Sequence, residues 1–200
     1  MLKTPKDVLE FWFGQLDENH FSEPELRKTW WESNLKFDNQ VRLRFFSTHQ
    51  AITESFPQDW LENPKGQLAY IIVLDQFSRN MYRGTPNMYS FDSLALSQAK
   101  RSIQKGVDVH FKGDPRSFFY LPFMHSEELS DQEKCVELFK NFLDELQGSS
   151  REYMQENYKF AIMHRDIVKR FGRFPHRNKI LGRPSTPDEE HFLKEPGSSF

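Results

Sequence analysis

The sequence has little cysteine and no long apolar run, and each shortage excludes a class of protein. Its one cysteine, Cys135, excludes an internal disulfide framework. The longest apolar runs, Leu68–Leu74 and Phe118–Met124, are far shorter than the ~20 residues that a membrane span needs. Asp7 and Glu10 interrupt any apolar stretch at the N-terminus that could resemble a signal peptide. We therefore expect a cytoplasmic protein that does not associate with membranes.

The chain also lacks a strong excess of charge. Its 27 Lys and Arg against 29 Asp and Glu give a net charge of −2, which provides no general attraction for nucleic acid. We recognise no nucleic-acid-binding module, and we expect no nucleic-acid partner. The 200 residues are enough to bury a core, to which 20 Phe contribute large side chains. Because no linker or low-complexity segment divides the chain, we predict one domain over residues 1–200.

Signals for strands are nearly absent, whereas signals for helices are frequent. Thr4-Pro5 and Asn63-Pro64 each place a capping residue before a proline at the first helical position. Thr186 and Glu189 form a capping box, as do Ser130 and Glu133. The sequence predicts an all-α fold of seven to nine helices, an irregular stack of antiparallel helix pairs. We read helices over about 5–13, 24–33, 38–54, 64–83, 87–105, 131–147, 151–171 and 187–193.

The stretch Leu68–Gly84 changes character halfway along. Its first seven residues are all apolar or aromatic, which is typical of a helix buried on every side. Polar residues that are costly to bury follow directly. If the helix continues, Asp75 and Arg79 are spaced to pair, while Gln76, Asn80 and Arg83 share one stripe. This cluster predicts either an ion-pair network that fixes the central helix or a ligand site.

A second polar cluster, His125-Ser126-Glu127-Glu128, follows an aromatic run. His-x-Glu is part of the zinc-deaminase pattern, but a chain with one cysteine cannot supply its Cys-x-x-Cys. Two histidines and a glutamate would suffice for catalytic zinc, so mixed ligands stay open. The other interpretations are a capped turn and a general polar site. We predict no bound metal and no cofactor.

The third and fourth clusters lie close together near the C-terminus. His164-Arg165-Asp166 sits late on a helix, where a hydrogen-bonded core histidine is commoner than a ligand, and Asp166 is spaced to pair with Arg170. Residues 164–183 hold seven Lys or Arg against one acid, a net +6. Arg173, His176 and Arg177 belong to this segment, which predicts either binding of a phosphate or carboxylate or pairing with acids elsewhere in the chain.

These clusters, taken in order, match the motifs of one family. The motifs are Phe11-Trp12-Phe13-Gly14, Leu74-Asp75-Gln76-Phe77, Arg79-Asn80 with Arg83-Gly84, Leu121-Pro122-Phe123-Met124-His125-Ser126-Glu127, His164-Arg165-Asp166, Arg170-Phe171-Gly172-Arg173-Phe174-Pro175-His176-Arg177-Asn178 and Leu181-Gly182-Arg183. The whole chain thus resembles the bacterial domain-of-unknown-function family numbered 924. The resemblance implies an all-helical, tetratricopeptide-repeat-like fold without an assigned activity.

One position departs from the family pattern. The family usually has proline where this chain has Ser78. A proline would remove a helical hydrogen bond, so a backbone shared with such relatives would break near Phe77 and disrupt the stripe of polar residues. Ser78 can also bond to the preceding turn and favour a bend.

Three functional hypotheses follow from these clusters. The first is a binding module with a polar groove for an anionic small molecule or an acidic peptide group. The second is a hydrolase-type enzyme that uses a His/Glu or His/Asp pair, although no nucleophile elbow or phosphate loop supports it. The third is a structural or interaction protein whose clusters are internal braces. The predicted groove residues are Asp75, Gln76, Arg79, Asn80, Arg83, His125, Glu127, His164, Arg165, Arg173, His176 and Arg177.

Overall fold

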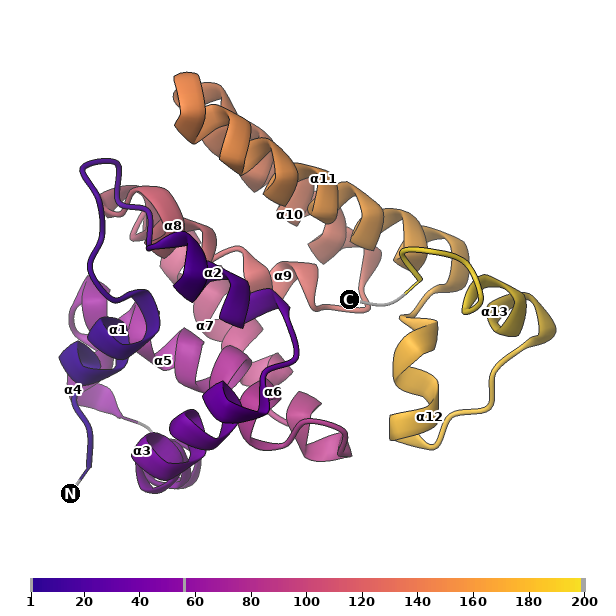
Figure 1. The fold of residues 1–200 in the computed structure, drawn as a ribbon, viewed down its shortest axis with the longest axis horizontal. Helices are drawn as coiled ribbons and strands as arrows, with labels where there is room; N and C mark the ends of the chain where they lie inside the picture. The colour runs from indigo at the N-terminus through magenta and orange to yellow at the C-terminus, as the bar shows by residue number, and fades with distance from the viewer. Residues whose placement is uncertain (1, 56, 199–200) are drawn as a thin grey trace. The chain divides into compact units, whose positions relative to one another are not determined.

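A computed structural model describes residues 2–55 and 57–198, and this part of the chain contains helices and no strand (Figure 1). The contacts divide the chain into two compact units. The first unit holds residues 1–83 and 87–122, and the second holds residues 84–86 and 123–200. The predicted all-α class is confirmed. The prediction of a single domain stays a prediction.

The helices of the first unit surround an aromatic core. Trp12 on α1 stacks on Trp30 of α2 with ring centroids 5.8 Å apart, and Phe118 lies edge-on to both rings. The unit contains α1 (Pro5–Phe13), α2 (Pro24–Trp31), α3 (Leu35–Glu54), α4 (Gln58–Leu61), α5 (Pro64–Ile72), the π-helical turn η1 (Val73–Phe77), α6 (Ser78–Met81), α7 (Asp92–Gln104), the 3₁₀ turn η3 (Asp108–His110) and α8 (Gly113–Ser117). The 3₁₀ turn η2 (Pro86–Tyr89) and α9 (Leu121–Met124) cross from one unit to the other.

The central helix is buried as its apolar run predicts. Every residue of α5 from Gly66 to Ile72 is buried. The helix contacts α1, α4 and α7, because no side of it carries a polar stripe that could face water (Figure 1). The apolar half of Leu68–Gly84 is therefore core.

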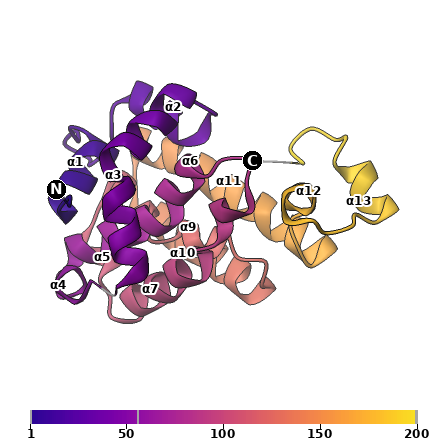
Figure 2. The same ribbon diagram turned by 90° about the horizontal axis from the view of Figure 1, so that it is seen from below.

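The second unit is built on a long helical hairpin, α10 (Leu129–Glu145) and α11 (Gly148–Phe171), which pack against each other along their length (Figure 1); Figure 2 shows the same hairpin from below. Cys135 of α10 is fully buried, and burial raises the pKa of its thiol. Gly172 ends α11 in the left-handed conformation. The chain continues through the 3₁₀ turn η4 (Pro175–Arg177), α12 (Asn178–Leu181) and α13 (Pro187–Phe192).

Local capping rules predicted three of four caps correctly. The caps at Thr4, Asn63 and Thr186 are confirmed. The capping box at Ser130 is wrong, because α10 begins at Leu129. The helices expected from 38, 87 and 151 begin instead at 35, 92 and 148.

The number of helices is larger than expected. The described residues form thirteen α-helices against the predicted seven to nine, because short helices of four to six residues add to the seven that have eight or more. None of the helices of residues 2–55 and 57–198 is long and apolar enough to cross a membrane.

Candidate functional site

The polar half of the central stretch continues the helix through one π-helical turn. Ser78 has helical backbone angles, so the helix does not break near Phe77. The Ser78 side chain is buried, and its Oγ lies 2.8 Å from Nε2 of His49 on α3. The hydroxyl therefore fixes the helix to a neighbouring helix where proline could not do so.

Arg79 is the centre of an ion-pair network in the first unit. Its Nη1 lies 3.0 Å from Oδ1 of Asp75, which confirms the pair expected four residues apart. Its guanidinium also donates to both carboxylate oxygens of Asp92, at 2.8 and 3.0 Å. Burial would lower the pKa of Arg79, but the carboxylates of Asp75 and Asp92 outweigh it and raise the pKa above its ordinary value. Gln76 donates to Asp75 at 2.6 Å.

Asp38 of α3 binds two further polar residues, Asn80 of α6 and Arg83 of the turn that follows it. The Asn80 amide donates to Asp38 at 2.7 Å, and Arg83 forms two hydrogen bonds to the same carboxylate at 2.7 and 2.9 Å. Asn80 and Arg83 thus meet the same carboxylate, but the helix ends at Met81 and Gln76 donates to Asp75, so the three residues do not form the predicted helical stripe. Both arginines meet carboxylates within their own unit, the arrangement expected of internal braces.

The candidate site lies in the second unit, around the buried ring of Phe174. The rings of His164 and His176 lie 5.5 and 5.6 Å from that of Phe174, and the Arg177 guanidinium lies over it at 4.5 Å. Three chain segments meet here, because Glu127 binds the backbone of Phe174 and the side chain of Arg183. We call this set the Phe174 cluster: Glu127, His164, Phe174, His176, Arg177 and Arg183.

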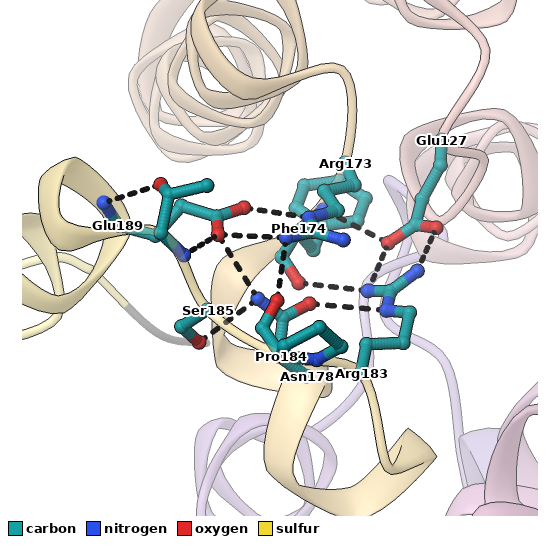
Figure 3. A network of polar contacts seen from close by, with 9 residues as sticks. Glu127, Arg173, Phe174, Asn178, Arg183, Pro184, Ser185 and Glu189 are labelled. Carbon is teal, nitrogen blue, oxygen red and sulfur yellow. Dashed lines mark hydrogen bonds and ion pairs between the residues drawn. The ribbon is translucent and has the colours of Figure 1, made fainter.

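Glu127 connects the segment between α9 and α10 to the C-terminal part of the unit (Figure 3). Its carboxylate accepts hydrogen bonds from Arg183 Nη1 and Nη2 at 2.6 and 2.9 Å and from the Phe174 N–H at 2.8 Å. Burial would raise the pKa of Glu127, but these bonds hold the pKa below its usual value. Glu127 is therefore an anion at neutral pH.

The histidines of the cluster are neutral at pH 7. Burial lowers the pKa of His164 to about 3, and its Nδ1 lies 2.8 Å from the Phe160 carbonyl, which confirms the expected core histidine. Burial and then the Arg177 charge lower the pKa of His176 to about 4. His125 acts electrostatically on both of these histidines, so it lies near the same cluster.

A second carboxylate secures the C-terminal segment beside the cluster. Glu189 of α13 receives two hydrogen bonds from Arg173, at 2.6 and 2.7 Å (Figure 3). These bonds are the main reason why the pKa of Glu189 falls to about 2. Asn178 donates to Ser185 and accepts from Arg183. Sequence reasoning missed Asp38, Asp92, Asn178, Arg183 and Glu189 as site residues. Asn178 and Arg183, in the family motifs, and Glu189, in a capping box, carried a signal, whereas Asp38 and Asp92 carried none.

The remaining predicted pairs differ from expectation. Asp166 does not pair with Arg170: Asp166 binds Arg165 at 2.6 Å, and Arg170 binds Asp188 at 2.9 Å. The His/Asp version of the hydrolase is not supported, because Asp166 is exposed and His164 is bonded to a backbone carbonyl. In the described part of the chain no group of three or more His, Cys, Asp or Glu is arranged to hold a metal.

The residues predicted to line one groove belong to two different units. Asp75, Gln76, Arg79, Asn80 and Arg83 gather in the first unit, and the others belong to the second. Within the second unit His125, Glu127, His164, His176 and Arg177 come together, Arg173 lies beside them, and Arg165 pairs with Asp166 on α11. A single groove that includes both sets stays a prediction.

Comparison with known proteins identifies the family of this chain. A search of the curated proteins found no match. The chain is similar to a solved structure of a protein of unknown function, ATU0120, from Agrobacterium tumefaciens, with 37% identity over 95% of this chain and 96% of that chain and a TM-score of 0.76. Residues 8–197 match the family described as bacterial protein of unknown function, DUF924. The chain therefore belongs to the DUF924 family.

Proposed function

We propose that this protein is a cytoplasmic binding module whose Phe174 cluster binds an anionic group of a small molecule or peptide. The observation that supports the proposal is the excess of cationic groups gathered around one buried ring. Arg177 and Arg183 act on one carboxylate, Glu127, so the formal charge is 2 − 1 = +1 with neutral histidines. Such a field favours an anion from solution.

The residue types suit a phosphate or carboxylate. A guanidinium presents a planar fork that matches two oxygens of either group. Arg183 and His176 are half-buried, so both can contact water and a bound solute. Arg177 is only 7% exposed and contributes its charge from within the protein, where its guanidinium lies 4.5 Å from the centre of the buried Phe174 ring.

We restrict the proposed site to the second unit. The wider groove expected from the sequence would add Arg79 and Arg83, but Arg79 binds two aspartates, and the Asp38 side chain that binds Arg83 is only 8% exposed, against 27% for Glu127. An external anion would have to displace two aspartates from Arg79. A bracing role for these residues needs no such exchange.

Titration with inorganic phosphate tests the proposal. We expect saturable binding to the wild type that weakens with added salt, because both partners are charged. Arg177→Gln is expected to weaken binding about tenfold, since one buried charge near the ligand is lost. Arg165→Gln is the matched control: it removes the same charge from the same segment, but Arg165 pairs with Asp166 outside the cluster.

Two results would contradict the proposal. One is equal loss of affinity in both variants, because the effect would then come from net charge alone. The other is an Arg177→Gln protein that binds phosphate like the wild type. Urea unfolding of each variant verifies that the folded state is being titrated.

A further inference from the structure

We infer that Glu127 is an internal ligand of this anion site: its carboxylate occupies the position that an external oxyanion would take, and a bound anion displaces it. The inference rests on the proposed function and adds a regulatory contact and a ligand class to it. The class is a compact oxyanion with two oxygens available, a carboxylate or a phosphate group.

The donors around Glu127 form a complete oxyanion cradle. Oε2 accepts from Arg183 Nη1 at 2.6 Å, and Oε1 accepts from Arg183 Nη2 at 2.9 Å and from the Phe174 N–H at 2.8 Å. A guanidinium fork together with a backbone N–H is the donor set by which proteins bind carboxylate and phosphate groups. Any bidentate oxyanion of similar size would satisfy the same three donors.

The cradle does not depend on Glu127 for its shape. Arg183 is also held by the Asn178 amide oxygen, which accepts from its Nε at 3.0 Å, and by the Phe174 carbonyl at 3.2 Å (Figure 3). Asn178 is in turn bonded to Ser185. The donors would therefore stay in place when the carboxylate leaves, which lowers the cost of exchanging one anion for another.

Glu127 can leave without movement of its backbone. The preceding residue is fixed by Gln132, whose amide donates to the Ser126 carbonyl at 2.6 Å, and the Ser126 hydroxyl donates to Asp131 at 2.9 Å. The Glu127 side chain is 27% exposed and that of Arg183 is 25% exposed. A rotation about the Glu127 side-chain bonds would thus carry the carboxylate into water and open the cradle.

Removal of the internal ligand should tighten binding of an external one. The experiment measures phosphate and, separately, acetate affinity of the full-length wild type, Glu127→Ala and Glu127→Gln. The Phe174 amide resonance is followed by NMR, because this N–H changes its acceptor. We expect phosphate to bind Glu127→Ala at least tenfold more tightly than the wild type. Glu127→Gln should be intermediate, since a neutral amide competes less well for the fork but preserves packing.

Glu128→Gln is the matched control, since it removes the same charge from an exposed neighbour outside the network of Figure 3. Its affinity should equal that of the wild type. If phosphate binds the wild type and neither Glu127 variant binds it more tightly, the internal-ligand role is overturned while the proposed function stands. If no variant binds phosphate or acetate, both are overturned. Tighter binding of only one probe identifies which oxyanion fits the cradle.

Discussion

Gly113 marks a close approach of two backbone segments in the first unit. It has φ +53°, and a Cβ built there would lie 2.0 Å from the His20 carbonyl oxygen. The next residue, Asp114, donates its N–H to the same carbonyl at 3.0 Å. Gly106 has a similar φ of +64° but nothing within 4 Å of its Cβ position. A side chain at Gly113 would therefore meet both backbone strain and steric overlap, whereas one at Gly106 would meet backbone strain alone.

We expect Gly113→Ala to lower the free energy of unfolding far more than Gly106→Ala. The second substitution adds only left-handed strain, about 1–2 kcal/mol. The first adds a further overpacking cost of about 1–3 kcal/mol, because backbone must move to admit the methyl group. Urea unfolding of both variants gives the difference. Equal losses would mean that the close approach is absent in solution.

Individual residues differ in how far one sequence predicts them. The core position of His164 can be predicted, because the apolar residues around it on the helix are visible in the local pattern. The partner of Glu127 is not visible, because Arg183 is 56 residues away and only the folded chain brings them together. The same holds for Asp38, which meets Arg83 across 45 residues. Local spacing predicts the Asp75–Arg79 pair, but it does not predict the Glu127–Arg183 and Asp38–Arg83 pairs.

Among the elements, the central helix combines a predictable half with an unpredictable one. Continuous apolar character predicts the burial of α5. The π-helical turn at Val73–Phe77 has no such signal, because the apolar and polar pattern of the sequence does not distinguish a π-helical turn from an α-helical one. Helix starts at Thr-Pro and Asn-Pro pairs were predictable from local chemistry, whereas the start of α10 is not set by its nearby hydroxyl residue Ser130.

Arg79→Ala should destabilise the first unit by about 3–5 kcal/mol, since it leaves the carboxylate of Asp75, 1% exposed, without its cation. The matched control is Lys159→Ala, which breaks an exposed pair with Glu156 and should cost less than about 1 kcal/mol. Urea unfolding measures both. If Arg79→Ala instead lowered phosphate affinity at unchanged stability, Arg79 would belong to the binding site and our restriction to the second unit would be wrong.

On the scale of the whole molecule, both units contain histidines that folding keeps neutral. Burial lowers the pKa of His49 in the first unit to about 4, and lowers those of His164 and His176 in the second to about 3 and 4. In the unfolded chain each titrates near 6.5. Below pH 6.5 the unfolded state therefore binds protons that the folded state does not, and folding becomes less favourable.

We expect the free energy of unfolding to be highest at neutral pH and to fall as pH is lowered from 6.5 towards 4. Each fully buried histidine contributes about 1–2 kcal/mol of this loss by pH 5. His49→Gln should reduce the loss of unfolding free energy between pH 7 and pH 5 by about 1–2 kcal/mol, the contribution of one buried histidine. His110→Gln, at an exposed position, should leave this loss unchanged. Urea unfolding at pH 7 and pH 5 provides the comparison. A wild type equally stable at both would show that these imidazoles are not kept neutral.

The distribution of the tryptophan residues between the two units has a spectroscopic consequence. All four tryptophans, Trp12, Trp30, Trp31 and Trp60, belong to the first unit, where three of them lie within ring contact. Intrinsic tryptophan emission therefore reports on the first unit, while far-ultraviolet circular dichroism, which follows helices, reports on both. Recording the two signals in one denaturation shows directly whether the chain melts as one cooperative body or in two steps.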